Sequence, residues 1–375
     1  MTQVRDILAA LNARFPFARA EKWDRTGLLI GSREAPASRV LVTYEVTDQV
    51  LEESAGCHCL VTYHPLLFRP LETLDFSNHT ARLAAECIRR GLSVIAAHTI
   101  LDGAPPPHAL GDALAAELGL SEVQVLAPSG HEELVSLCVF VPHAQAESVA
   151  RALWQAGAGS IGNYDRASFR TQGQSTFRAL EGAHPSVGQI GLMEFAPETR
   201  LEVILPASRQ AQVLEAMKKA HPYEEVAHFV SPLLNRGEAY GSCRVGRLQS
   251  PLSLDEWARV VEQKLQPPNT RLVRAKEKIE RVACVPGSGA SFLEATALAD
   301  VDCLVSGDFK HHDALKARAL GVSVVDVTHS PTERAAVSML AEALASTCQV
   351  QVSHAPMNPF EAFGGAASGG LERRV

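Results

Sequence analysis

The feature of this 375-residue sequence that most restricts its fold is a series of short apolar runs that alternate with helical patterns. The runs are Val40–Tyr44, Cys59–Tyr63, Leu92–Ala97, Val301–Val305 and Val322–Val327. Parallel strands need a crossover connection, which is usually a helix. The alternation therefore predicts an α/β fold with a mainly parallel sheet and flanking helices. The length of the chain favours two domains.

Four of these apolar runs lead directly into segments rich in histidine and carboxylate side chains. The four segments are Tyr63–Pro65, His98–Asp102, Gly307–His312 and His329–Glu333. In open α/β sheets, ligands bind at the carboxyl ends of the strands. We therefore expect a binding or catalytic site where these segments meet.

The pattern changes between Glu133 and Leu234, where new strand-like and helical segments follow one another. They are Leu134–Val141, Ala144–Ala156, Leu201–Leu205, Arg209–Ala220 and Val226–Val230. Their order is typical of a ferredoxin-like α+β module. Because the earlier pattern resumes at Gly241, we expect residues 131–236 to form an inserted domain. Residues 1–130 and 237–375 would then form the two halves of one α/β domain.

The composition excludes several classes of partner. The formal net charge is −7 and the chain has no long basic run, so nucleic acid and anionic membranes are not expected partners. A small molecule fits better. The N-terminal residues do not resemble a secretory leader, and no run of about 18 apolar residues occurs. We expect a cytoplasmic protein.

The eight cysteines are scattered along the chain, which is typical of buried thiols in a reducing compartment. Cys57 and Cys59 form the one local cluster, with His58 between them. Their spacing is not that of a zinc knuckle and no second pair lies nearby, so we interpret them as packing residues.

Two pairs of potential metal ligands share one spacing. His98 and Asp102 are four residues apart, and so are His329 and Glu333. Imidazole and carboxylate ligands together suit zinc, iron, manganese or cobalt. The sequence predicts a divalent metal centre formed by His64, His98, Asp102, His329 and Glu333.

Four of these five residues also have a structural interpretation. Glu333 would be the third helical residue of a capping box that begins at Ser330. His98 would be a buried histidine bonded to the backbone, and Asp102 would start a turn at Gly103. His64, which precedes a proline, would be a loop histidine.

His311 and His312 begin a predicted helix after the strand-like segment at Val301–Val305. They are candidates for contact with substrate or for proton transfer. The alternative is that both rings are solvated in the first turn of the helix.

Six ordered blocks of the sequence resemble the Nif-three-like family of dinuclear-metal-centre hexamers, also called type-two GTP cyclohydrolase I homologues. The blocks are Trp23–Leu29, Tyr63–Phe68, Ala97–Asp102, Gly287–Ala290, Ser306–Asp313 and Thr328–Arg334. They span nearly the whole chain. The resemblance implies a homohexamer that encloses a central cavity.

The insert resembles a PII-like module found in one variant of this family. The similarity rests on Gly157–Tyr164, Ser168-Phe169, Gly173, Thr176–Arg178, Leu180–Gly182 and His221–Glu225. It implies that the insert lies toward the openings of the hexamer. We interpret His221–Glu225 as part of the packing of the module rather than as a second metal site.

The resemblance implies metal ligands at His64, Asp102, His329 and Glu333, with His98 in the same motif. The first histidine of one family motif is Tyr63 in this chain. A phenol with a pKa of about 10 must ionise before it becomes a good ligand. We therefore expect one or two metal ions per chain. Glu45 is a further departure, because relatives often have aspartate there.

The leading functional hypothesis is a metal-dependent hydrolase of a small nucleotide-like or heterocyclic substrate. Glu333 or Asp102 would orient the attacking water, and His311 or His312 would transfer a proton. The sequence has neither a P-loop nor a convincing dinucleotide-binding motif, so nothing in it indicates GTP specificity.

Two other functions are compatible with the same residues. The first is a non-catalytic hexamer that stores, delivers or senses metal, or that scaffolds partners. The second is a small-ligand sensor in the inserted module that regulates access to the cavity. Turnover that requires the metal would separate the hydrolase from both.

Overall fold

The computed structural model describes residues 2–360, which fold into two compact units. The first unit combines the described residues up to Gly130 with those from Tyr240 onward, and the second is His131–Ala239. Each unit has its own hydrophobic core.

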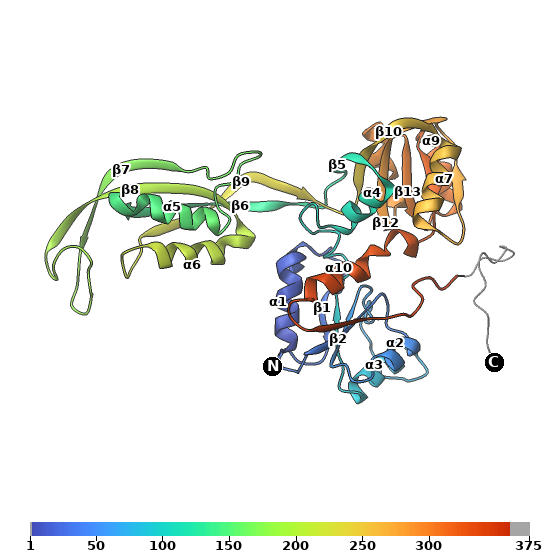
Figure 1. Ribbon diagram of the computed structural model, residues 1–375, viewed down its shortest axis with the longest axis horizontal. Coiled ribbons are helices and arrows are strands. Elements are labelled where there is room, and N and C mark those ends of the chain that lie inside the picture. Colours follow the sequence, from blue (N-terminus) through green and yellow to red (C-terminus); the bar gives the residue numbers. More distant parts are fainter. Residues whose placement is uncertain (1, 361–375) are drawn as a thin grey trace. The chain divides into compact units, whose positions relative to one another are not determined.

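The first unit contains two mixed sheets (Figure 1). One has the order β1-β4-β3-β2-β15, with strands at Gly27–Ile30, Ser93–Ala96, Cys59–Thr62, Arg39–Thr43 and Gln349–Val352. Four of its strands are parallel, and β1 pairs antiparallel with β4. A strand from the end of the described chain therefore completes a sheet built from the first hundred residues.

Both faces of this sheet are covered by helices. Helices α1 (Val4–Arg14) and α10 (Ala335–Leu344) pack on one face, and α2 (Asp48–Glu53) and α3 (His79–Arg89) pack on the other. Side chains alternate between the faces of a strand. Val40 and Val42 of β2 accordingly join the core beneath α1 and α10, whereas Leu41 joins the core beneath α2 and α3.

The second sheet has the order β11-β14-β13-β12-β10-β5. Its strands span Arg271–Val273, Ser323–Asp326, Cys303–Gly307, Lys278–Ser288, Arg244–Ser253 and Ser121–Val125. Strands β12, β13 and β14 are parallel, and the other pairs are antiparallel. Helices α4 (Leu110–Leu118) and α7 (Leu254–Leu265) pack on one face, and α8 (Leu293–Leu298) and α9 (His311–Ala319) flank the other.

The single, mainly parallel sheet expected from the sequence is therefore two sheets, each of which combines parallel strands with at least one antiparallel strand. The expectation failed because several strands, among them β5, β10 and β15, lack continuous apolar runs. Arg247 of β10, for example, pairs its guanidinium with Glu280 of β12. A half-exposed strand with such polar residues has no continuous apolar run, so the apolar pattern does not predict it.

Helix α7 shows how local sequence determines an element. Ser253 accepts a hydrogen bond from the backbone of Glu256, whose carboxylate accepts one from the Ser253 backbone. This reciprocal capping box satisfies amides that the first turn leaves without partners. Trp257, Val261 and Leu265 follow at helical spacing and are buried.

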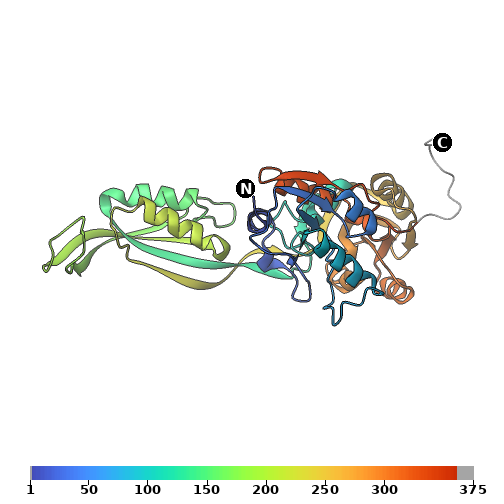
Figure 2. The same cartoon turned by 90° about the horizontal axis from the view of Figure 1, so that it is seen from below.

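The second unit has the element order β6-α5-β7-β8-α6-β9. The elements span Gly130–Pro142, Ala146–Gln155, Phe169–Arg178, Met193–Pro206, Gln210–Ala220 and His228–Tyr240. The sheet order is β7-β8-β6-β9, and α5 and α6 lie side by side on one of its faces (Figure 2). Strand β7 was absent from the sequence-based expectation because most of its side chains are exposed and polar.

His221 in this unit has a structural role. Its Nε2 lies 2.9 Å from the carbonyl oxygen of Phe140, and its Nδ1 accepts a hydrogen bond of 3.1 Å from the amide of Tyr223. Both ring nitrogens are therefore occupied by the backbone, as the packing interpretation of this segment requires.

Within residues 2–360, no helix has the length and apolar character to cross a membrane. All eight cysteines are free thiols, and Cys57 and Cys348 are the only two that are not fully buried.

We expect the first unit to fold without the second. The amide of Ser129 donates a hydrogen bond of 2.9 Å to the carbonyl of Tyr240, so the two ends of the first unit are adjacent in space. Deleting residues 131–239 and closing the gap with a short flexible linker should leave one cooperative thermal transition by circular dichroism. Residues 131–239 expressed alone provide the matched control. A soluble deletion variant without a cooperative transition would contradict this division.

Candidate metal site

A cavity of about 1410 Å³ lies at the carboxyl ends of strands from both sheets of the first unit. Tyr44 follows β2, His64 follows β3 and His98 follows β4. Asp308 follows β13, and His329 follows β14. The strand ends that carry histidine and carboxylate residues in the sequence thus meet at one place.

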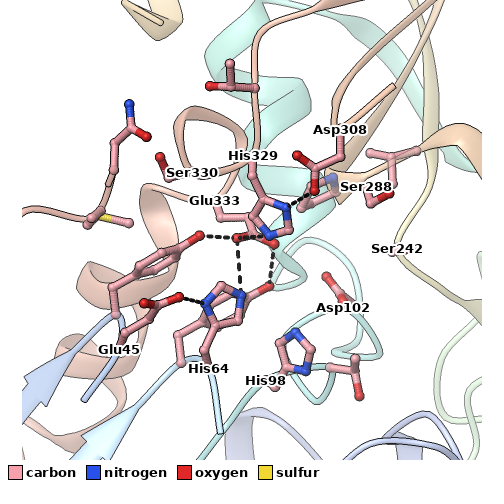
Figure 3. Close-up of a pocket in the computed structure, with 18 of the residues that line it drawn as sticks. Glu45, His64, His98, Asp102, Ser242, Ser288, Asp308, His329, Ser330 and Glu333 are labelled. Carbon is pink, nitrogen blue, oxygen red and sulfur yellow. Dashed lines mark hydrogen bonds and ion pairs between the residues drawn. The ribbon is translucent and has the colours of Figure 1, made fainter. Parts of the chain in front are cut away.

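Three of the predicted metal ligands converge in this cavity (Figure 3). Nε2 of His329 lies 3.1 Å from Oε2 of Glu333, and Nε2 of His64 lies 3.6 Å from the same oxygen. One donor atom from each residue lies within 4.8 Å of the other two. Two imidazoles and a carboxylate at this separation form a donor set that suits a divalent ion.

The other ring nitrogen of each cavity histidine contacts a carboxylate. The pairs are His64 with Glu45 at 3.1 Å, His98 with Asp24 at 2.9 Å, and His329 with Asp308 at 2.7 Å. A carboxylate at Nδ1 keeps the proton on that nitrogen and leaves the lone pair of Nε2 available. Histidines that bind metals are usually oriented in this way.

Glu333 is the centre of the site and is only 3% exposed. The Tyr63 hydroxyl donates to its Oε1 at 3.2 Å, and the Tyr44 hydroxyl donates to its Oε2. Burial alone would raise the pKa of Glu333, but the hydrogen bond and charge of His329 outweigh it, and the pKa is lowered. Burial and the nearby Glu333 raise the pKa of both phenols, so they remain neutral donors.

The capping interpretation of Glu333 is wrong in this structure. A capping box would require Ser330 as the N-cap residue of a helix. Instead, Ser330–Thr332 form a single 3₁₀ turn, and its N-cap residue is His329. The carboxylate of Glu333 reaches into the cavity and contacts His329, Tyr44 and Tyr63. Its charge is therefore available to a ligand of the cavity.

Three residues around the site have a positive φ, a backbone conformation that residues other than glycine rarely adopt. Asp308 has φ of 61° and Thr328 has φ of 64°, immediately after β13 and near the end of β14. Gly287 has φ of 66°, and a Cβ there would lie 2.5 Å from Oε1 of Glu333. Residues held in sparsely populated conformations cluster at functional sites.

Asp102 and His98 line the same cavity, but they do not belong to the group of three that meets within 4.8 Å. Oδ1 of Asp102 is buried and has no hydrogen-bond partner. Burial raises the pKa of Asp102 to about 7. Burial opposes protonation of His98, yet its hydrogen bond to Asp24 outweighs this effect and raises the pKa of His98.

The structure does not bring His311 and His312 into the cavity. Both are exposed in the first turn of α9, and neither lines the cavity. The residue of that segment that does reach it is Asp308. The sequence placed all three in one block, and the left-handed backbone at Asp308 separates their directions.

The sequence reasoning also missed Asp24 and Tyr44 as parts of the site. Asp24 is buried and accepts hydrogen bonds from His98 and from the amide of Thr99. Burial would raise its pKa, but these bonds hold it at about 2. Tyr44 ends one of the apolar runs, and this position was the only signal that its hydroxyl would reach a strand-end site.

The residues fit a divalent metal on three observations: the converging donors, the carboxylates at Nδ1, and the buried Oδ1 of Asp102 that lacks a partner. In the metal-free protein, burial lowers the pKa of His329, but Glu333 and Asp308 outweigh it and raise the pKa to about 9. His329 is then protonated at neutral pH, and it must release that proton to become a ligand.

Comparison with known proteins identifies the family to which the chain belongs. A family model described as Duf34/NIF3 (NGG1p interacting factor 3) matches residues 2–359. A GTP cyclohydrolase 1 type 2 homolog from Bacillus subtilis is 36% identical over 355 residues, which cover 92% of this chain and 94% of the relative.

A second homolog with the same name, from Halalkalibacterium halodurans, is 36% identical over 318 residues, or 84% of this chain and 85% of the relative. The crystal structure of a Bacillus cereus protein related to NIF3 matches with a TM-score of 0.86 and 34% identity, and covers 96% of this chain and 98% of that one. The chain therefore belongs to the Duf34/NIF3 family.

Proposed function

We propose that this protein holds a divalent metal ion between His64, His329 and Glu333 and uses it to hydrolyse a small heterocyclic or nucleotide-like substrate. The observation that carries the proposal is the convergence of these donors, with each imidazole oriented by a carboxylate at Nδ1. Zinc, iron, manganese and cobalt are the ions that this donor set suits. When bound, such an ion supplies Lewis-acid polarisation and lowers the pKa of water.

In this proposal Asp102 accepts the proton that the attacking water loses. Its Oδ1 is buried at the edge of the donor group and has no hydrogen-bond partner, so it can accept a proton. Glu333 remains a carboxylate because Tyr44 and Tyr63 donate to it. His311 and His312 have no part, because both lie outside the cavity.

The name of the two relatives, GTP cyclohydrolase 1 type 2 homolog, supports hydrolysis of a ring-containing substrate. A family name does not by itself establish a reaction. The site supports the class of chemistry, and the name supports the heterocycle.

A second candidate function is non-catalytic handling of metal, by storage, delivery or sensing. The side chain of His329 is 37% exposed, so an ion at the site can be reached from solvent. An exchangeable ion without turnover would be the property of such a protein. The test of hydrolysis below separates the two functions.

The homohexamer and the PII-like character of the insert are also part of the proposal. The insert exposes large apolar side chains on its strands, among them Phe169, Phe195 and Phe229. Large aromatic side chains are enriched at protein interfaces. This exposure supports self-association that involves the insert.

We expect hydrolysis that depends on the metal. The purified protein should hydrolyse at least one member of a panel of nucleosides, nucleotides and pterins, and a chelator should abolish the activity. Glu333→Gln removes an anionic ligand, so it should lower metal affinity by more than the roughly 10–100-fold that is typical of changes to groups that only orient ligands. His108→Ala, at an exposed histidine outside the cavity, is the control and should retain metal and activity.

Equal turnover with and without metal would contradict the hydrolase proposal. Metal bound tightly without turnover of any substrate in the panel would favour the metal-handling alternative.

We expect Tyr63 to limit the site to one ion. Its neutral phenol donates to Oε1 of Glu333 and stands where the family motif has histidine. Tyr63→His should raise the metal content from one toward two ions per chain, because an imidazole would join Glu333 and Asp102 around a second position. Tyr63→Phe, which keeps the ring and removes the hydroxyl, should remain at one. Two tightly bound ions in the unmodified protein, measured by elemental analysis, would show that this explanation of Tyr63 is wrong.

We expect light scattering of the full chain to give the mass of six copies. Charged substitutions at Phe169 and Phe195 should reduce the assembly to smaller species, because each replaces an exposed apolar ring with a charge, Phe169 on one face of the sheet and Phe195 on the other. A single-copy mass for the unmodified chain would contradict the hexamer.

A further inference from the structure

Two large aromatic rings line the cavity and remain exposed. Trp23 is 57% exposed and Phe68 is 45% exposed. Their ring centroids are 6.1 Å apart, with an interplanar angle of 62°. An isolated exposed apolar side chain needs no explanation. A pair that shares a cavity with charged groups offers an aromatic surface to a bound molecule.

The position of Trp23 is fixed by its neighbour. Asp24 is buried and accepts a hydrogen bond of 2.9 Å from the Thr99 amide and one of 2.9 Å from Nδ1 of His98. These bonds tie the Trp23 segment to the end of β4.

The aromatic surface is next to the metal ligands. The Trp23 ring lies 6.0 Å from the ring of His98, and that ring lies 5.1 Å from the ring of His64. A planar molecule on Trp23 would therefore lie beside the three converging donors.

The charges of the cavity restrict the ligand further. Among the described residues that line it, the carboxylates are Glu21, Glu45, Asp102, Asp308, Asp326 and Glu333, and the permanently cationic side chain is Arg271. Arg271 already pairs with Asp326 and donates to the carbonyl of Phe309 at 2.8 Å. Protein sites for phosphate usually supply arginine, lysine or a helix N-terminus. This cavity does not provide an unpaired cationic side chain among those residues.

Resting on the hydrolase proposed above, we propose that the substrate is an uncharged planar nitrogen heterocycle that stacks on Trp23 against the edge of Phe68, and that the cavity discriminates against nucleoside polyphosphates. The aromatic wall recognises the ring. The carboxylates that line the cavity outnumber the charges of Arg271 and one bound divalent ion, so the lining stays negative and repels a chain of phosphates. The polar edge of the ring then faces His98 and the metal ligands.

The test is calorimetric binding to the full-length, zinc-loaded protein, with guanosine, adenosine and pterin as uncharged probes and GTP as the charged probe. Guanosine and GTP carry the same base, so they differ only in the phosphates. At least one uncharged probe should bind, and GTP should bind more weakly than guanosine. The difference should shrink as salt is added, because salt screens the carboxylates.

Trp23→Ala should weaken binding of the uncharged probe by about fivefold or more, since stacking of one base on an aromatic ring has at least this effect. Trp23→Phe should restore most of the affinity. Metal content should be equal in both variants, which distinguishes a lost stacking surface from a damaged site. Tyr164→Ala, at an exposed ring in the insert, is the matched control and should bind as the unmodified protein does.

The proposal would be overturned by tighter binding of GTP than of guanosine, by equal binding in Trp23→Ala, or by the absence of binding for all three uncharged probes. Trp23 fluorescence that responds to dilution of the protein but to none of the probes would also overturn it, because it would place the ring in an interface between copies. Binding is measured without turnover. A protein that binds guanosine as expected but hydrolyses nothing would contradict only the hydrolase proposal.

Discussion

The buried carboxylate of Glu333 is the interaction on which the rest of the site depends. It lies between the ends of strands from two sheets: Tyr44 and Tyr63 reach it from the first sheet, and His329 reaches it from the end of the second. A buried charge is costly unless it is paired and hydrogen-bonded. Removing one partner of a buried ion pair costs about 3–5 kcal/mol. The contacts to Glu333 therefore hold the two strand-end regions together and keep an anion where a cation can bind.

The histidines of the cavity are also held by pairing with opposite charge. Each imidazole in the cavity has a carboxylate at Nδ1, and these carboxylates come from Asp24, Glu45 and Asp308. The orientation of every Nε2 is thus determined by a residue from a different segment of the chain. This arrangement leaves the cavity rich in negative charge, which suits a metal ion and opposes phosphate. Tyr63 differs from these charged residues, because its neutral hydroxyl donates a hydrogen bond to Glu333 and adds no charge to the cavity.

The fold was predictable where the pattern is local and uninterrupted. The apolar runs of β2, β3 and β4 are strands in one parallel arrangement, as their sequence predicts. In α7, a capping box and apolar residues at helical spacing mark the helix in the sequence itself. Prediction failed at β5, β10 and β15, whose polar or exposed residues break the apolar pattern. It also failed at the number of sheets, because pairing between β15 and β2 joins residues about three hundred positions apart and leaves no local signal.

By itself, the sequence determined which chemistry stands at the strand ends: His64, His329 and Glu333 were identified from residue type and spacing alone. Only the tertiary structure decided that these three meet, that Asp102 and His98 lie beside them, and that Asp308 enters the cavity while His311 and His312 do not. The physical reason is that a strand end fixes where a side chain begins but not what it faces. That depends on strand pairing between distant segments and on backbone angles such as the positive φ of Asp308 and Thr328.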